Sequence, residues 1–114
     1  MSIETLAGIV IYSPALETAL AFYRDQLGLP LVAAAHGPVK RHHEGLIGQT
    51  HVALWPGPAR IVPVFRVSQL SATLALCEER GMRRSFGPIA LGEGKVVSGL
   101  CAPDGEEVRL IEIG

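Results

Sequence analysis

Four histidines are the side chains of this sequence best suited to bind a metal ion or to transfer a proton. All of them lie in the first half of the 114-residue chain, at His36, His42, His43 and His51. Imidazole binds several transition metals and titrates near neutral pH. Because His42 and His43 are adjacent, only one of them can face a common site with His51 if the segment is a strand. Two interpretations stay open: a three-histidine site that includes His36, or surface and hydrogen-bonded histidines near a strand turn.

Other catalytic motifs are absent from the sequence. The spacing of Cys77 and Cys101 makes no redox or zinc motif. There is no Gly-x-Ser-x-Gly segment, and the glycines of 92–99 lack the spacing and the following helix of a phosphate loop. We therefore assign no catalytic residue from motifs.

The elements that must position these side chains occur twice along the chain. An apolar run at 9–11 and another at 62–67 each precede a helical pattern, which ends at Gly28 and Gly81 respectively. The apolar positions of the two helical patterns are Leu16, Leu20 and Tyr23 in the first half and Leu70, Leu74 and Cys77 in the second. The offset between matching positions is 54 residues, close to half of the chain. This repeat predicts two copies of one strand–helix–three-strand unit.

The predicted elements follow from these runs and from the glycine and proline breaks between them. In the first half we predict a strand at 6–12, a helix at 14–27 and strands at 30–36, 39–48 and 50–55. In the second half we predict a strand at 61–67, a helix at 69–80 and strands at 82–91, 94–102 and 106–113. Ser13 is the expected N-cap of the first helix, with Pro14 in its first turn. We expect one domain over 1–114, with module one at 1–56, module two at 60–114 and a linker from Pro56 to Ala59.

Composition excludes several classes of function. Ten basic and eleven acidic residues give a formal charge of −1, so no basic surface for nucleic acid is expected. There is no apolar stretch of membrane-spanning length and no export signal, so we expect a cytoplasmic protein without a membrane partner. Hydrophobic residues make up 48% of the chain and charged residues 18%, which favours a homodimer that buries surplus apolar surface.

Two segments carry a resemblance to a known family. The end of the first helix, "AFYRDQLGL", and the last turn and strand, "PDGEEVRLIE", resemble the vicinal oxygen chelate superfamily. That superfamily includes glyoxalase I, extradiol dioxygenases, fosfomycin-resistance enzymes and bleomycin-resistance proteins. The resemblance covers nearly the whole chain. It implies an α+β fold in which two βαβββ modules form a curved-sheet cup, which in this family is often completed between chains.

The resemblance also indicates where a metal ion would be bound. In metal-using members, the first and last strands of each module supply His, Gln or Glu ligands. The corresponding positions here are Gly8 and Ala53 in the first module and Val62 and Arg109 in the second. None of these side chains can hold a divalent cation, and arginine repels one. We therefore predict that the usual metal site is absent, and we expect no cofactor.

These positions also identify the inward face of the strands, because side chains alternate along a strand. The face carries Gly8, Val10, Tyr12, His51, Ala53, Trp55, Val62, Val64, Arg66, Glu107, Arg109 and Ile111. Among its polar and aromatic members, the predicted ligand-binding residues are Tyr12, His51, Trp55, Arg66 and Arg109. The two arginines could hold an anion as a planar fork. Alternatively, Arg109 pairs with Glu107 or another acid and fills the vacated metal space.

The leading hypothesis is a metal-independent small-molecule-binding protein, similar to the bleomycin-resistance branch. It would sequester an organic ligand, anionic or aromatic, in an apolar cup. The alternative is a lyase, isomerase or dioxygenase of the superfamily, with a non-standard histidine-based metal site or metal-free acid–base chemistry. In that case His51 or Glu107 would carry the proton. A third hypothesis is a subunit or regulator whose cup binds only a partner.

Overall fold

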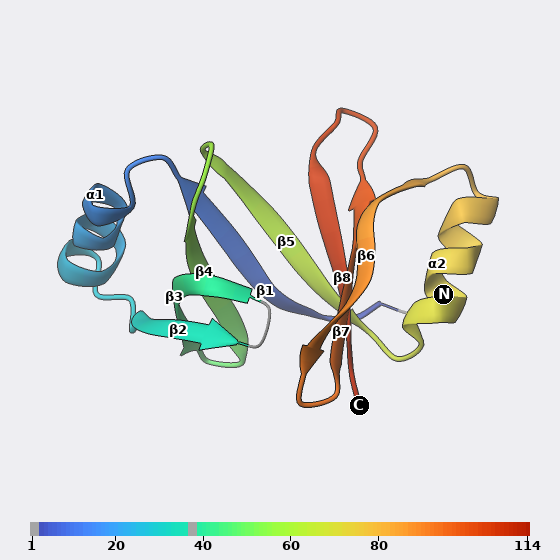
Figure 1. Ribbon diagram of the computed structural model, residues 1–114, viewed down its shortest axis with the longest axis horizontal. Helices are drawn as coiled ribbons and strands as arrows, with labels where there is room; N and C mark the ends of the chain where they lie inside the picture. Colours follow the sequence, from blue (N-terminus) through green and yellow to red (C-terminus); the bar gives the residue numbers. More distant parts are fainter. Residues whose placement is uncertain (1–2, 37–38) are drawn as a thin grey trace. The chain divides into compact units, whose positions relative to one another are not determined.

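The computed structural model describes residues 3–36 and 39–114, except for the side chains of 36–41 (Figure 1). The strands are β1 (Ile3–Ser13), β2 (Val32–His36), β3 (Val39–Ile47), β4 (Thr50–Pro56), β5 (Arg60–Val67), β6 (Arg83–Gly92), β7 (Lys95–Cys101) and β8 (Glu107–Ile113). The helical segments are α1 (Leu16–Leu20), the π-helix η1 (Ala21–Gln26) and α2 (Leu70–Glu79). No helix in the described residues is long and apolar enough to cross a membrane.

The chain forms two compact units. The N-terminal unit is Gly8–Ile61, and the C-terminal unit combines Met1–Ala7 with Val62–Gly114. The strand β1 therefore contributes its first residues to one unit and the rest to the other. The prediction of a single domain with a linker from Pro56 to Ala59 stays a prediction.

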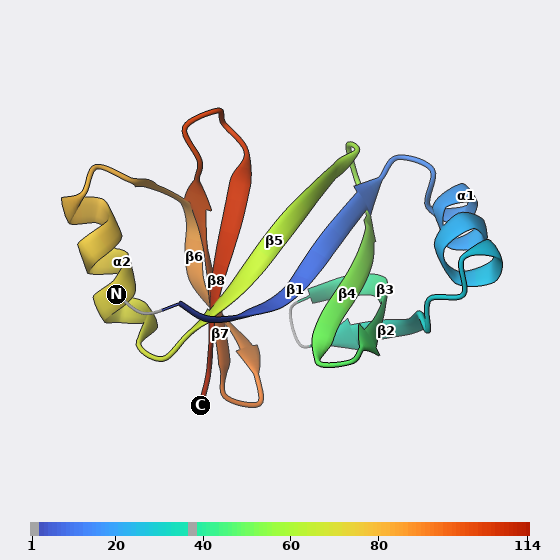
Figure 2. The same ribbon diagram turned by 180° about the vertical axis from the view of Figure 1, so that it is seen from behind.

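Both units have the same topology. In the N-terminal unit the strand order is β2-β3-β4-β1, and in the C-terminal unit it is β6-β7-β8-β5. The first and last strands of each module are parallel neighbours, with Val10 opposite Ala53 in β1 and β4, and Val64 opposite Arg109 in β5 and β8. The helix α1 packs on β4, and α2 packs on β6 and β8 (Figure 2). The predicted fold class, α+β with two βαβββ modules, is confirmed.

The start of the first helix differs from the sequence prediction. The helix begins at Leu16, its N-cap is Ala15, and no side chain caps it. Ser13 is still the last residue of β1, and its hydroxyl accepts a hydrogen bond from the Ala15 N–H at 3.2 Å. The predicted cap at Ser13 was therefore wrong, because the strand continues through this residue and Pro14 precedes the helix.

The end of the first helix also has a feature that residue periodicity did not reveal. From Ala21 to Gln26 the segment is a π-helix, and the Leu27 N–H donates to the Phe22 carbonyl at 2.8 Å. Gly28 then adopts φ +87°, the left-handed conformation predicted for it, and Gly81 does the same at φ +83°.

Each unit has its own apolar core between its helix and its strands. In the N-terminal unit the buried cluster consists of Ile11, Ala19, Leu20, Leu31, Val52 and Leu54. In the C-terminal unit it consists of Val67, Leu70, Leu74, Cys77, Leu100 and Leu110. Since Val52 and Leu54 alternate with His51, Ala53 and Trp55 along β4, the latter three lie on the face turned away from the core. This alternation positions the candidate site.

Candidate functional site

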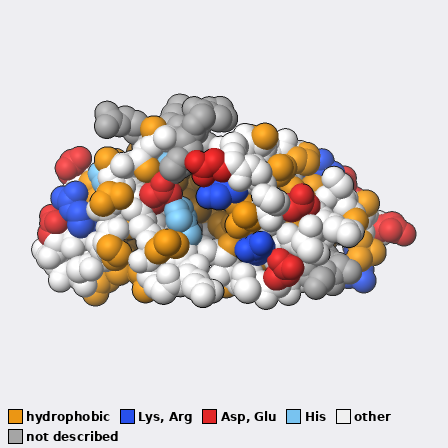
Figure 3. Space-filling model, turned by 90° about the horizontal axis from the view of Figure 1, so that it is seen from below, with side chains coloured by type: hydrophobic (Ala, Val, Ile, Leu, Met, Phe, Trp, Pro, Cys, Tyr) orange, Lys and Arg blue, Asp and Glu red, His pale blue; other side chains and the backbone are white. Residues whose placement is uncertain are grey.

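The side chains with the most chemical capacity gather on one face of the N-terminal unit. We call this surface the β4 face and define it by Tyr12 of β1, His42 and Glu44 of β3, and His51 and Trp55 of β4. Parallel pairing sets Tyr12 opposite Trp55, and antiparallel pairing sets Glu44 opposite Ala53. In a view of the surface, an exposed histidine side chain lies beside acidic side chains (Figure 3).

A carboxylate lies between two imidazoles on this face. The Glu44 Oε2 is 2.5 Å from the Nε2 of His51, a short hydrogen bond, and 3.6 Å from the Nε2 of His42. The His42 side chain is 3% exposed and that of Glu44 is 14% exposed, whereas that of His51 is 45% exposed. Hydrogen bonds of a carboxylate to an imidazole are stronger than neutral ones. The pair Glu44–His51 can therefore hold or transfer a proton at a point that solvent and a ligand can reach.

Aromatic rings also lie on the β4 face. The His42 and Trp55 rings are stacked, with centroids 4.2 Å apart and planes at 8°. Tyr12 pairs with Trp55 in the strand register. The guanidinium carbon of Arg60 lies 4.4 Å from the centroid of the Tyr12 ring. Gly57 allows this packing, because a Cβ there would lie 3.2 Å from the Tyr12 ring. Flat rings beside a cation suit a planar, negatively charged molecule.

The predicted arginines lie in the C-terminal unit, and each has an acidic partner. Arg109 donates to the Glu107 Oε1 from both Nε and Nη2, at 3.1 and 2.8 Å. Its guanidinium carbon also lies 5.4 Å from the centroid of the Phe86 ring. The alternative in which Arg109 pairs with Glu107 is therefore the arrangement observed.

Arg66 is held by a different acid. Its Nε is 3.3 Å from the Glu4 Oε1, and both side chains are exposed. In the register Arg66 lies opposite Ile111, whereas Arg109 lies opposite Val64. Of the five predicted ligand-binding residues, the structure brings Tyr12, His51 and Trp55 onto one face and gives Arg66 and Arg109 separate ion pairs.

The residues at the family's metal-ligand positions do not fit a metal ion. Gly8 and Ala53 have no donor atom in the N-terminal unit, and neither does Val62 in the C-terminal unit, while Arg109 is a cation bound to Glu107. The register also sets Gly8 beside His51, not beside Ala53. Among the described side chains, those of residues 3–35 and 42–114, no group of three His, Cys, Asp or Glu side chains is arranged to hold a metal.

The histidines are distributed as strand alternation requires. His42 and His51 share the β4 face, where both Nε2 atoms approach the same carboxylate oxygen. His43 lies opposite Leu54, on the other side of the strand, and its buried Nδ1 has no hydrogen-bond partner. The side chain of His36, the fourth candidate, lies outside the described part of the structure.

Two members of the β4 face, His42 and Glu44, and the neighbouring Arg60 were not among the predicted ligand-binding residues. His42 was considered as a metal ligand or as a surface or hydrogen-bonded histidine, and neither Glu44 nor Arg60 was a candidate. A signal for the first two was available, because His42 and Glu44 are two residues apart and must share a face on a strand. No comparable signal pointed to Arg60, which follows the Pro-Gly-Pro segment at 56–58.

Comparison with known families assigns the chain to a superfamily. The model of the Glyoxalase/Bleomycin resistance protein/Dioxygenase superfamily matches residues 5–109, so the chain belongs to this superfamily. The resemblance found in the sequence is thereby confirmed. No curated protein matches the chain.

Solved structures with the same fold include proteins of named and unnamed activity. A hypothetical protein from Bacillus halodurans C-125 has a TM-score of 0.79 and 18% identity over 96% of this chain and 94% of its own. A Streptomyces coelicolor methylmalonyl-CoA epimerase variant, in complex with 2-nitronate-propionyl-CoA, has a TM-score of 0.76 and 18% identity over 99% and 96%. The Mycobacterium tuberculosis methylmalonyl-CoA epimerase has a TM-score of 0.71 and 19% identity over 98% and 89%. At this identity the likeness shows the shared fold.

Proposed function

We propose that the protein binds a small organic molecule without a metal ion and that the ligand lies against the β4 face. The observation that carries the proposal is the row of flat side chains on this face: the stacked His42 and Trp55 rings, and Tyr12 beside them. Gly8 and Ala53 have no side-chain atom that could bind a metal ion, which supports binding through ring contacts and hydrogen bonds instead. The protein would retain its ligand in the cytoplasm without breaking a bond.

The charges on this face favour an anionic ligand with a planar or acyl part. The exposed Arg60 beside Tyr12 offers a cation at one end, and His51 offers a ring nitrogen at the other. A coenzyme A ester, the ligand class of the Streptomyces coelicolor structure, combines phosphates, a planar base and a small acyl group. We therefore include coenzyme A esters with aromatic carboxylates among the candidate ligands.

The test uses an intrinsic reporter, because Trp55 is the single tryptophan of the chain. Methylmalonyl-CoA and a series of aromatic carboxylates are titrated against the purified protein while tryptophan fluorescence is recorded. A ligand of the β4 face should quench or shift the emission of Trp55 saturably. In Tyr12→Ala the affinity should fall about two- to tenfold, the effect of one lost aromatic contact.

Tyr23→Phe is the matched control, because Tyr23 packs on the core of the same unit. This variant should bind as the natural protein does. A ligand that binds with unchanged Trp55 fluorescence, or equally well to Tyr12→Ala, would contradict the proposed location.

The Glu44–His51 contact favours a second candidate function, metal-free proton transfer. A part-buried carboxylate 2.5 Å from an imidazole is suited to act as a general base. Glu44 would take a proton from the carbon next to a carbonyl group, and the same proton or one from solvent would return to that carbon. His51 would orient the carboxylate and support its change of charge.

Hydrogen exchange distinguishes this candidate from simple binding. Methylmalonyl-CoA is incubated with the protein in D2O, and deuterium at the carbon between its carbonyl groups is followed by NMR. An isomerase would accelerate the exchange over buffer, and Glu44→Gln would abolish the acceleration. Binding without accelerated exchange would leave the sequestering function as the better account.

A further inference from the structure

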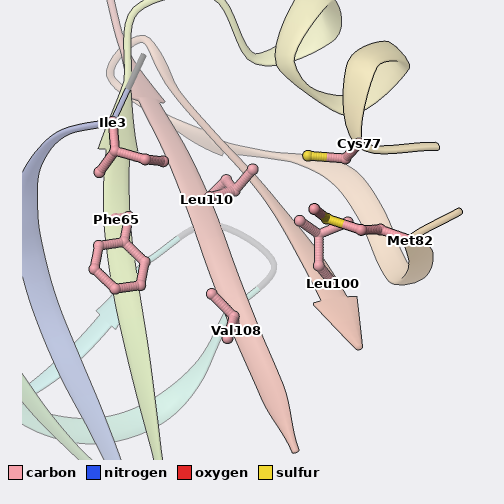
Figure 4. A pocket seen from close by; sticks show the side chains of 7 residues that line it. All are labelled: Ile3, Phe65, Cys77, Met82, Leu100, Val108 and Leu110. Atoms are coloured by element: carbon pink, nitrogen blue, oxygen red, sulfur yellow. The ribbon is translucent and has the colours of Figure 1, made fainter. Parts of the chain in front are cut away.

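The C-terminal unit contains an apolar cavity on the side of its strands that faces α2 (Figure 4). Its volume is about 220 Å³. The floor is formed by Cys77 of α2, Leu100 of β7 and Leu110 of β8, which are 1%, 7% and 3% exposed. At the mouth lie Ile3 and Met82, which are 47% and 40% exposed. A small molecule can therefore enter from solvent and reach a buried floor.

The cavity is separate from the polar face of the same strands. Phe65 of β5 and Val108 of β8 complete its walls, and Val108 lies between Glu107 and Arg109 in the sequence of β8. Since side chains alternate along a strand, Glu107 and Arg109 point to the opposite side. Every side chain that lines the cavity ends in carbon or sulfur. A ligand here would be held by apolar contact without charge.

The internal repeat explains why the space exists. Leu20 and Leu74 occupy matching places in the two helices, and one turn later Tyr23 matches Cys77. In the N-terminal unit the Tyr23 ring packs against the core cluster. In the C-terminal unit the smaller Cys77 side chain takes this place in the core cluster. At this helix position the C-terminal unit thus lacks the ring that its counterpart has, although Phe65 of β5 supplies a ring from the strand side.

We propose that this cavity binds one uncharged aromatic ring, which takes the place that Tyr23 has in the other unit. Dry apolar cavities of about 150 Å³ lined by aliphatic and aromatic side chains bind benzene. A polar substituent is disfavoured, because a hydroxyl buried among these side chains loses its hydrogen bonds to water. The site is independent of the proposed function, since its lining residues belong to the C-terminal unit and the β4 face to the N-terminal unit.

The test is a titration of the full chain with toluene and with phenol, followed by two-dimensional amide NMR. Toluene should shift the amide signals of residues around Cys77, Leu100 and Leu110 saturably. Phenol should bind at least tenfold more weakly. Cys77→Phe, which supplies the missing ring, should abolish toluene binding and keep the fold. Cys101→Ala, outside the cavity, is the control and should bind toluene as the natural protein does.

A second variant keeps the test decisive if Cys77→Phe fails to fold. Val108→Phe fills the cavity from the strand side and should also abolish toluene binding. No saturable shift with toluene, equal binding of toluene and phenol, or full toluene binding by a folded ring-filled variant would each overturn the proposal.

Discussion

The clearest consequence of the β1–β4 register is that a side chain at position 8 is unfavourable. A Cβ built on Gly8 would collide with the backbone carbonyl oxygen of His51, and it would lie 3.1 Å from the carbonyl carbon of the same residue. A backbone carbonyl in a strand cannot rotate aside as a side chain does. Any larger residue would push β1 and β4 apart, so we expect this strand pair not to accept a metal-binding side chain at position 8.

We predict that Gly8→Ala destabilises the protein by about 1–3 kcal/mol, the usual cost of overpacking a buried site. For a chain of this length, that corresponds to a melting temperature lowered by about 4–12 °C. Urea unfolding followed by circular dichroism gives the free energy of unfolding. Gly114→Ala is the control, since its Cβ would meet only the Gly94 carbonyl oxygen, at 3.8 Å. It should change the stability by less than about 0.5 kcal/mol.

Gly8→His extends the same reasoning to metal binding. This variant should be at least as unstable as Gly8→Ala. A bound Zn²⁺ ion would stabilise the folded state by mass action and raise the melting temperature. Since we expect no metal site to form, Zn²⁺ should leave the melting temperature of Gly8→His unchanged. A Gly8→Ala protein as stable as the natural one, or a Gly8→His protein stabilised by Zn²⁺, would refute the register argument.

Three further predictions concern stability and assembly. Glu112→Ala should lower the free energy of unfolding by about 1 kcal/mol, because the Glu112 Oε1 accepts a hydrogen bond from the Leu70 N–H at 2.6 Å at the start of α2. The control Glu106→Ala should leave the free energy of unfolding unchanged. Equal effects of the two substitutions in urea unfolding would rule out this cap. Glu107→Gln should lower the free energy of unfolding by about 1–3 kcal/mol, because it removes the carboxylate that pairs with the largely buried Arg109 guanidinium. Calorimetric melting that matches the natural protein would show that this ion pair does not stabilise the fold. The protein should be a homodimer, and a monomer mass in light scattering at high concentration would overturn this expectation.

The internal repeat made the fold predictable from the sequence. Apolar alternation along 50–55 and 106–113 identified the strands, and the helix-facing residues Leu54 and Leu110 are buried as that alternation requires. Gly28 and Gly81 marked the helix ends correctly because a positive φ is unfavourable for other residues. The predicted cap at Ser13 was wrong because the sequence signals of the strand and the helix overlap there. Residue types alone do not show whether the strand ends or the helix begins at this residue. The π-helix depends on hydrogen bonds that leave no periodic signature in so short a segment.

The site was only partly predictable, for a reason that lies in strand pairing. Alternation placed His51 and Trp55 on one face of β4, but the partners of these residues come from β3. The register of β3 and β4 follows from the turn at Gly48 and Gln49, which sets Ile47 opposite Thr50 and Glu44 opposite Ala53. A two-residue turn at Gly48 and Gln49 would by itself have placed Glu44 opposite Ala53, on the same face as His51. The ion pair of Arg66 with Glu4 joins segments far apart in sequence, and no local pattern indicates it.

The most direct test of metal-independent binding is to measure ligand affinity by titration calorimetry before and after chelator treatment, with elemental analysis of the same samples. If the protein binds its ligand without a metal ion, the purified protein should contain less than stoichiometric zinc, nickel, iron and manganese. The dissociation constant should be the same in both samples and after each ion is added back. Stoichiometric metal in the purified protein, with affinity lost on chelation and restored by that ion, would contradict the central claim.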